Sequence, residues 1–315
     1  MMNSVLKTLC SAAALTICTV GAAWAEYPDR TISLMVPFAA GGGADVPARF
    51  IAEELEKELG QSVVVSNVTG AGGTVGATQL STATADGYSL GFMPVGTTTT
   101  QPHLRGTSYG VDSFIPICMV ASGPFYLVVD ADSEFKTWED LEAKAKGDGI
   151  TFTGAAPGSL AHVTSVALGA MWSVDVGYLP TKGGGDAMNE LKGGRADATA
   201  WFSDFDVRFG LNALAIFAPE RSEIHPDVPT SGDKGHPSDI AVWMGIFAPA
   251  GTPDDVVAKL DSACEAAITS EGFTANMEKA NREIRHMNTD EFSAFFRKAF
   301  EENGALLRNA GLVKN

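Results

Sequence analysis

Short apolar strands that alternate with amphipathic helices constrain this chain more than any other feature of its sequence. The run Thr31–Val36 has the character of a buried strand and stops at Pro37. A glycine-rich loop follows, and Asp45 and Pro47 then suit the first turn of a helix that ends near Gly60. Repeats of this strand–loop–helix order are typical of α/β domains built on parallel sheets.

The same order recurs in two series of similar size. The first series predicts further strands at 62–66 and 88–95, and the second begins near Phe125 after a break at Ser122–Pro124. The second series and the segment after it predict strands at 125–129, 150–153, 176–179, 198–202, 213–217 and 243–248. Residues 253–311 are predicted to be almost wholly helical, and we expect this tail to cover an apolar face of the first unit.

The charge balance narrows the classes of partner. The 315 residues include 38 acidic and 22 basic side chains, for a formal net charge of −16, and 45% of the residues are apolar. The apolar fraction is that of a globular protein rather than a disordered one. Nucleic acid and anionic membrane surfaces need clustered Lys and Arg, and the sequence contains no such cluster.

The N-terminus has the form of a cleaved signal peptide. Lys7 precedes an uncharged stretch that ends in Ala23-Trp24-Ala25, so we expect cleavage after Ala25 and release into the periplasm. The alternative is an uncleaved membrane anchor. Two cysteines, Cys118 and Cys264, then remain outside the signal peptide. They could pair in an oxidising compartment, but two cysteines make no disulfide framework, and we expect them to be unpaired.

Two glycine-rich loops dominate the candidate functional residues. Each follows a strand and opens a helix, where glycine lets the backbone approach a ligand and unpaired N–H groups direct partial positive charge at an anion. The alternative is that these glycines only form tight turns. The candidate ligand-binding residues in the first series are Phe38, Ala40, Gly41, Gly42 and Asp45, then Asn67, Gly70, Ala71, Gly72 and Gly73, with Thr97 after the third strand.

The second series offers candidate partners at equivalent positions. Ser159 suits a helix N-cap that also donates to a ligand, and Lys182 either faces a cleft or is an ordinary solvated lysine. A lone histidine such as His162 is more often packed than functional, and Trp201 suits a core as well as a site wall. The candidates in this series are Thr153, Ser159, His162, Thr181, Lys182, Gly183, Trp201 and Asp204.

Signals for catalysis are poor. The sequence has no Gly-x-Ser-x-Gly elbow, no phosphate-binding Gly-Lys-Ser/Thr loop and no His-Glu-x-x-His motif. The five histidines are scattered without the spacing of metal ligands. We therefore expect a binding protein with no catalytic residues, no cofactor and no metal. The alternative is a secreted enzyme acting on small organic acids.

Several short motifs together resemble one receptor family. Each is weak alone, but their order and spacing span nearly the whole chain after the signal peptide: Val36-Pro37-Phe38, Gly41-Gly42 with Asp45, Gly70-Ala71-Gly72-Gly73, Asp86-Gly87-Tyr88, Gly158-Ser159 with His162, Pro180 with Lys182-Gly183, and Ala248-Pro249-Ala250-Gly251-Thr252-Pro253. In these stretches the chain resembles the periplasmic substrate-binding receptors of tripartite tricarboxylate transporters, the Bug family.

The resemblance implies an α/β protein with the two-lobe, type II Venus-flytrap fold of periplasmic binding proteins, each lobe a mainly parallel sheet flanked by helices. The implied divisions are a signal peptide at 1–25, lobe 1 at 26–123, lobe 2 at 124–240, and a mostly helical return to lobe 1 at 241–315. It also implies a carboxylate ligand held in the cleft between the lobes and delivery to membrane permease subunits, with a sensor kinase as the alternative partner. A monomer that binds no nucleic acid is expected.

The chain departs from the usual family pattern at three places. Val68-Thr69 stands where Arg-Pro is usual, Thr181 where Tyr is usual, and Asp186 where Pro is common. These changes put a smaller hydroxyl and an additional acid near the second lobe's loop. They favour an unusual ligand, one that carries an amine or is not a dianion.

Overall fold

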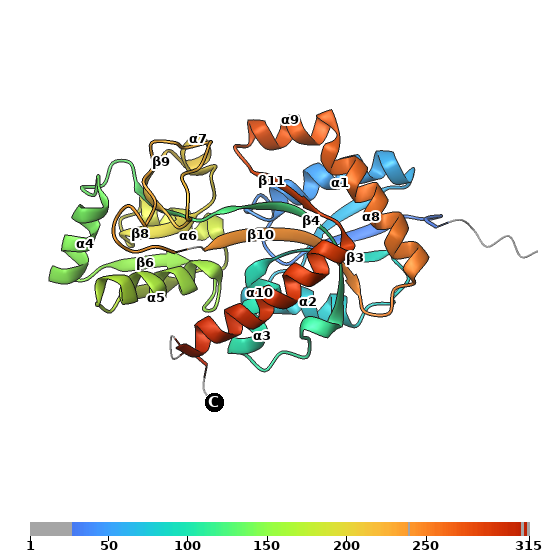
Figure 1. The fold of residues 1–315 in the computed structure, drawn as a ribbon, viewed down its shortest axis with the longest axis horizontal. Coiled ribbons are helices and arrows are strands. Elements are labelled where there is room, and N and C mark those ends of the chain that lie inside the picture. Colours follow the sequence, from blue (N-terminus) through green and yellow to red (C-terminus); the bar gives the residue numbers. More distant parts are fainter. Residues whose placement is uncertain (1–26, 239, 310–311, 314–315) are drawn as a thin grey trace, which may run out of the picture.

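Two β-sheets, each flanked by helices, form two bodies connected by long strands (Figure 1). This computed structural model describes residues 27–238, 240–309 and 312–313, so the predicted signal peptide lies outside the described residues. We call the body around the six-stranded sheet lobe 1 and the body around the five-stranded sheet lobe 2. The predicted two-lobe α/β architecture is confirmed.

The sheet of lobe 1 combines strands from both ends of the chain. Its spatial order is β11 (Ile284–Met287), β4 (Phe114–Pro124), β10 (Ala241–Pro249), β3 (Ser89–Pro94), β1 (Ile32–Val36) and β2 (Val63–Asn67). Strand β1 pairs in parallel with β2 and β3, whereas β10 is antiparallel to both of its neighbours.

The sheet of lobe 2 comes from one continuous part of the chain. Its order is β7 (Gly177–Pro180), β6 (Thr151–Gly154), β8 (Ala198–Trp201), β5 (Tyr126–Asp130) and β9 (Leu211–Ile216). Strand β6 is parallel to both neighbours, and β5 is antiparallel to both of its own. Each sheet is thus mixed rather than mainly parallel, because β10 in lobe 1 and β5 in lobe 2 are antiparallel to their neighbours.

Helices cover both faces of each sheet. In lobe 1 they are α1 (Asp45–Leu59), η1 (Ala71–Gly73), α2 (Thr74–Ser81), η2 (Gly96–Thr100), α3 (Gln101–Leu104), η3 (Val111–Ser113), α8 (Asp254–Thr269), α9 (Glu271–Lys279) and α10 (Thr289–Asn309). In lobe 2 they are α4 (Trp138–Gly147), α5 (Leu160–Trp172), α6 (Gly184–Lys192) and α7 (Phe205–Phe209).

Alternation along the strands of lobe 1 assigns side chains to the two faces of its sheet. Leu34 of β1 and Ile246 of β10 belong to the core that also contains residues of α1, α8 and α9. Their neighbours Met35 and Phe247 point the other way, into a cluster with residues of α2 and α10. This two-residue period is the reason that both faces need a helical layer.

The C-terminal tail is less helical than the sequence predicts. Lys279 ends α9, and β11 then pairs with the outer edge of β4 before α10 begins. Strand β4 is also absent from the sequence prediction, which placed a break at Ser122–Pro124. Both strands are stabilised by pairing with strands that are distant in the sequence, and local sequence patterns contain no information about such pairing.

A disulfide joins Cys118 of β4 to Cys264 of α8, with Cα atoms 6.6 Å apart. The expectation of unpaired cysteines is therefore wrong. The two residues lie 146 positions apart in the sequence. They meet because α8, from the C-terminal part of the chain, packs on the sheet that β4 enters from the N-terminal part.

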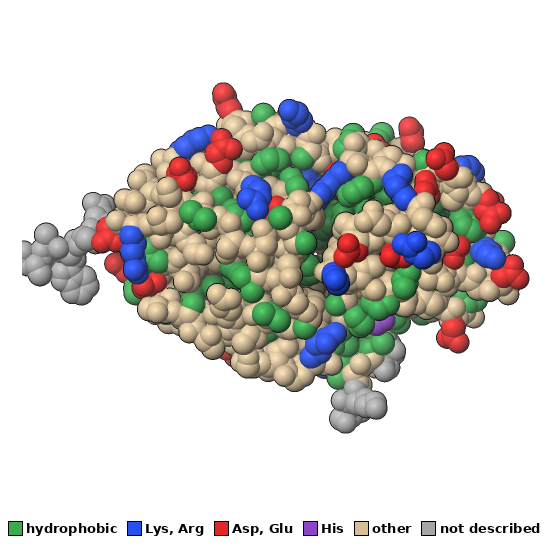
Figure 2. Space-filling model, turned by 180° about the vertical axis from the view of Figure 1, so that it is seen from behind, with side chains coloured by type: hydrophobic (Ala, Val, Ile, Leu, Met, Phe, Trp, Pro, Cys, Tyr) green, Lys and Arg blue, Asp and Glu red, His purple; other side chains and the backbone are tan. Residues whose placement is uncertain are grey.

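On the molecular face seen in Figure 2, Lys and Arg side chains are scattered among acidic ones rather than gathered in one patch. Among the residues that the structure describes, no helix is both long and apolar enough to cross a membrane.

Candidate functional site

A cavity of about 430 Å³ lies between the two lobes, at the ends of several strands. Residues of lobe 1 and of the crossing strands that line it are Phe38, Ala39, Ala40, Gly41, Gly42, Gly43, Ala44, Gly72, Pro94, Val95, Gly96, Phe125, Val242 and Met244. Residues of lobe 2 that line it are Gly154, Ala155, Ser159, Leu160, Ala161, Lys182, Gly183, Gly184, Gly185, Asp186, Ala187, Asn189, Thr199, Ala200, Trp201 and Phe202.

The loop between β1 and α1 forms one wall of the cavity, and hydrogen bonding by Asp45 fixes the conformation of this loop. The Asp45 carboxylate accepts a hydrogen bond from the Gly41 N–H at 2.7 Å and is paired with Arg49 at 2.8 Å. Burial raises the pKa of this carboxyl, but the hydrogen bonds from Arg49, Asn67 and Gly41 outweigh burial and lower it. Asp45 is therefore an ionised anchor of the loop and does not itself line the cavity.

Asn67 joins the two glycine-rich loops of lobe 1. Its side-chain amide donates to the Phe38 carbonyl and to Asp45 Oδ1, each at 2.8 Å. The loop that follows Asn67 contributes Gly72 to the same cavity as Phe38, so the two loops are brought together at one site.

The other candidates of the second loop shape its turn rather than the wall of the cavity. Gly70, Ala71, Gly72 and Gly73 all have positive φ, a conformation that glycine adopts readily. A side chain at Gly73 would meet Thr97 Oγ1 at 2.4 Å, and that hydroxyl donates to the Gly72 carbonyl at 3.3 Å. Of these five residues, only Gly72 lines the cavity.

Ser159 caps α5 at the opposite wall. Its Oγ accepts from the His162 N–H at 3.4 Å and lies 3.2 Å from the Tyr178 hydroxyl, which donates to the Ala155 carbonyl. The Gly158 N–H donates to His162 Nδ1 at 3.1 Å, and burial lowers the pKa of His162. The neutral imidazole thus supports the capping loop as an acceptor, and His162 does not line the cavity.

The loop before α6 is tied to β6 through Thr181. The Thr181 hydroxyl lies 2.9 Å from the Gly154 carbonyl oxygen and 2.8 Å from that of Gly183. Thr153 is buried in β6, where its hydroxyl donates to the Leu179 carbonyl at 3.0 Å. These two threonines therefore position the loop, whereas the neighbouring Lys182 and Gly183 line the cavity.

Trp201 forms part of the lobe 2 wall, and Asp204 fixes its orientation. The indole N–H donates to Asp204 Oδ1 at 3.0 Å. Asp204 is buried outside the cavity lining and also faces two cations, Arg208 at 3.5 Å and Arg282 at 3.4 Å.

Arg282 and Arg208 connect the lobes beside the cavity. Arg282, in lobe 1, reaches Asp204 of lobe 2, donates to the Gly43 carbonyl at 2.9 Å, and lies 3.9 Å from the Phe202 ring centroid. Arg208, in lobe 2, donates to the Gly41 carbonyl of lobe 1. Burial lowers the pKa of Arg282 to about 10, which leaves the guanidinium charged near neutral pH. The structure is thus a closed arrangement in which buried polar contacts cross between the lobes.

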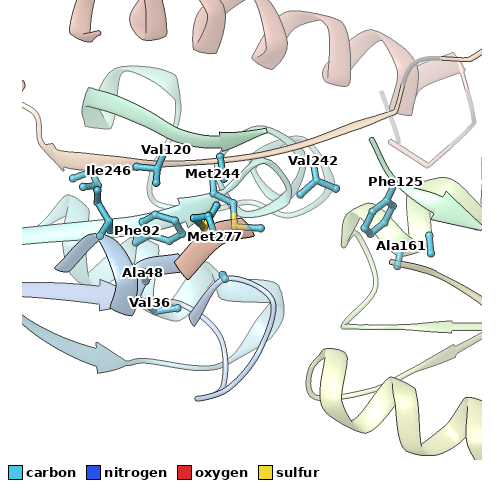
Figure 3. Close-up of a cluster of buried hydrophobic side chains, with 14 of the residues drawn as sticks. Val36, Ala48, Phe92, Val120, Phe125, Ala161, Val242, Met244, Ile246 and Met277 are labelled. Atoms are coloured by element: carbon cyan, nitrogen blue, oxygen red, sulfur yellow. The ribbon is translucent and has the colours of Figure 1, made fainter. Parts of the chain in front are cut away.

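Residues at the crossing between the lobes line the cavity but were absent from the sequence prediction. Figure 3 shows Val242 and Met244 along β10, with Phe125 and Ala161 nearby where the chain enters lobe 2. Their sequence signal is the alternation of an ordinary buried strand, which does not distinguish a cavity wall from a core. Phe202, which follows the same strand as Trp201, also lines the cavity, as the sequence suggests for a wall residue.

The arrangement can bind an anion but offers little for catalysis. Helices α1, α5 and α6 begin at the cavity, and each helix start carries about half a unit of positive charge. Within the described ranges, no group of three or more His, Cys, Asp or Glu side chains is placed to hold a metal ion.

Comparison with known proteins shows similarity to one family of transporter receptors over most of the chain. The model of the family described as "Tripartite tricarboxylate transporter family receptor" matches residues 47–312. BugT of Bordetella pertussis is 33% identical over 258 residues, which cover 78% of each chain. MatC of Rhodopseudomonas palustris, solved with bound malate, is 28% identical at a TM-score of 0.83, covering 89% of this chain and 100% of its own. Rpa4515 of R. palustris, solved with adipate, is 25% identical at a TM-score of 0.85, covering 91% and 99%.

Proposed function

Because this chain belongs to the family of tripartite tricarboxylate transporter receptors, we propose that it is a periplasmic receptor for a small carboxylate. The receptor binds this acid between its lobes and delivers it, unchanged, to the permease subunits of a membrane transporter. It acts as a monomer after removal of residues 1–25 and carries out no reaction on the ligand.

The observation that carries this proposal is the convergence of three helix N-termini and two glycine-rich loops on one cavity. Exposed N–H groups at such places bind carboxylates without requiring a charged side chain for each oxygen. MatC and Rpa4515, which hold malate and adipate, support the same ligand chemistry here.

We propose that the candidate residues divide into two groups. Those lining the cavity contact the ligand: Phe38, Ala40, Gly41, Gly42, Gly72, Ser159, Lys182, Gly183 and Trp201. The others hold these in place: Asp45 and Asn67 for the first loop, Gly70, Ala71, Gly73 and Thr97 for the second, Thr153, His162 and Thr181 for the loops of lobe 2, and Asp204 for Trp201.

Binding and closure are coupled in this proposal. An acid that touches both lobes stabilises the closed arrangement, in which Arg282 bridges Asp204 and the Gly43 carbonyl. In an open arrangement these groups would be solvated separately. The ligand therefore shifts the population toward closure by the free energy of the contacts that only the closed state makes.

Thermal unfolding of residues 26–315 with a panel of mono- and dicarboxylates tests the proposal. An acid present at a hundredfold excess over its Kd stabilises the protein by about 2.7 kcal/mol, which raises the melting temperature. Isothermal calorimetry then gives the affinity, and chromatography of the released acid checks that it is unchanged. If no acid of a broad panel binds, the carboxylate assignment is wrong, and conversion of a bound acid would instead indicate an enzyme.

A further inference from the structure

The side chains of the cavity are mostly apolar, and its charged side chains lie at the solvent-exposed rim. Among the residues that line the cavity, the two with charged side chains are Lys182 and Asp186, and both are exposed. The interior side chains at the crossing between lobes are Phe125, Val242 and Met244, and all three lack a polar group that could face a second carboxylate.

Aromatic rings make a large share of the interior wall. Phe202 packs edge to face against Phe125, with centroids 5.6 Å apart, and against Trp201, with centroids 5.2 Å apart. A further ring extends such a cluster in the same edge-to-face or offset geometry. The volume of about 430 Å³ lies within the usual range for small-molecule sites, ~300–1,000 Å³, and has room for a ring-bearing acid.

The helix starts favour one carboxylate more than two. Helices α1 and α6 each carry an acid in the first turn; Asp45 of α1 is paired with Arg49, whereas the exposed Asp186 of α6 lines the cavity and opposes an incoming anion. Helix α5 has no acid in its first turn, and its N-cap Ser159 lies on the cavity wall. A first carboxylate is well placed between this helix start and the Ala40 and Gly43 amides, since the N–H groups of Gly41 and Gly42 already donate to Asp45 and to the Ala39 carbonyl.

A second carboxylate would lack an equivalent place. Against Phe125 or Met244 it would lose its hydration without gaining hydrogen bonds, which is costly for a charged group. At the rim the second carboxylate would be attracted by Lys182, in the loop before α6. Asp186, in the first turn of α6, offsets that attraction.

We infer that the ligand is a singly charged carboxylate with an apolar, ring-bearing body. Its carboxylate lies between the α5 start and the first glycine-rich loop, and its ring packs against Phe125, Trp201 and Phe202. This inference rests on the proposed function and narrows its ligand class, with Asp186 as a residue that discriminates against dicarboxylates.

Calorimetry with acids of matched size separates the possibilities. The probes are 3-phenylpropanoate, its neutral analogue 3-phenylpropanamide, and the dicarboxylates malate, adipate and phenylsuccinate. We expect 3-phenylpropanoate to bind at least tenfold more tightly than each dicarboxylate and than the amide. Tighter binding of malate, adipate or phenylsuccinate would overturn this inference while leaving the proposed function intact. Binding of none of these acids, nor of any acid in the broad panel, would remove the proposed function as well.

Two variants test the part played by Asp186. In Asp186→Asn we expect the preference for 3-phenylpropanoate over adipate to fall at least threefold, because one repulsive charge is removed from the rim. Asp148→Asn is the matched control, since Asp148 is exposed at the end of α4 and is not among the residues that line the cavity. An unchanged preference in Asp186→Asn, or an equal change in Asp148→Asn, would refute the role given to Asp186.

Discussion

Replacing Gly43 with alanine tests whether closure of the lobes controls ligand affinity. Gly43 lies on the first glycine-rich loop of lobe 1, and a Cβ atom there would come within 2.2 Å of Phe202 Cε2 in lobe 2. The backbone of Gly43 is outside the positive-φ region, so alanine causes no strain within the loop itself. The overlap therefore arises between the lobes.

The size of the effect follows from that overlap. Carbon atoms pack at about 3.5–4.0 Å, so the Phe202 ring must retreat by more than about 1 Å for the lobes to close. Phe202 is held by Phe125, Trp201 and the guanidinium of Arg282, which limits its retreat. Overpacking of this kind costs about 1–3 kcal/mol. Because the cost falls on the closed state, the Kd should rise roughly 5- to 150-fold.

Two measurements on Gly43→Ala check this reasoning. Calorimetry with the tightest-binding acid of the panel gives the Kd, and small-angle X-ray scattering gives the ligand-dependent decrease in radius of gyration. We expect weaker binding, less compaction at equal ligand concentration, and a melting temperature without ligand close to that of the unaltered protein. Gly147→Ala in α4, where a Cβ meets open space, is the control and should keep its Kd within about twofold. Unaltered affinity and compaction in Gly43→Ala would show that contact between this loop and Phe202 does not limit closure.

Three further predictions concern the supports of the site. Asp45→Asn removes the charge that pairs with Arg49, and we expect calorimetry to show a Kd about tenfold higher; an unchanged Kd would contradict the anchoring role. Burial lowers the pKa of His162, so in the folded protein the imidazole stays neutral through the usual histidine value of about 6.5 and protonates only at lower pH. Affinity should therefore stay constant between pH 7.5 and about 6.5 and fall only as the pH drops through the lowered pKa, and this fall should be absent in His162→Gln; a drop in affinity already complete at pH 6.5 would contradict the supporting role of His162. Reduction of the Cys118–Cys264 disulfide, which closes a loop across a separation of 146 residues, should lower the free energy of unfolding in urea by about 2–5 kcal/mol; equal urea midpoints with and without reductant would argue against that bond.

The sequence predicts the strand-to-helix junctions well because their signals are local. A strand, a glycine-rich loop and a capping residue such as Ser159 all lie within a few positions, and the structure has helices starting at these places. The division of labour among the candidates was not predictable in the same way. Asp45 and Asn67 have residue types that suit ligand contact, yet their partners turn out to be the loop's own backbone and Arg49.

The remaining features depend on contacts between segments that are distant along the chain. Arg282 follows a helix in the tail, and nothing in its neighbourhood indicates that it reaches Gly43 and Asp204. Met244 alternates with buried neighbours like any core residue, and its place in the cavity depends on where β10 crosses between lobes. Strand β11 is a short strand on the edge of β4, and local pattern alone assigned it to a helix.

The position of β10 has a consequence for how the molecule assembles. This strand lies between β3 and β4, although it follows every strand of lobe 2 along the chain. During synthesis, which proceeds from the N-terminus, all strands of lobe 2 are therefore made before β10 can pair with β3 and β4 and complete the sheet of lobe 1. Until β10 arrives, β3 and β4 each have an unpaired edge of the kind that invites wrong pairing. Lobe 2 is thus the part able to fold early, and the completion of lobe 1 is the late, vulnerable step of biogenesis.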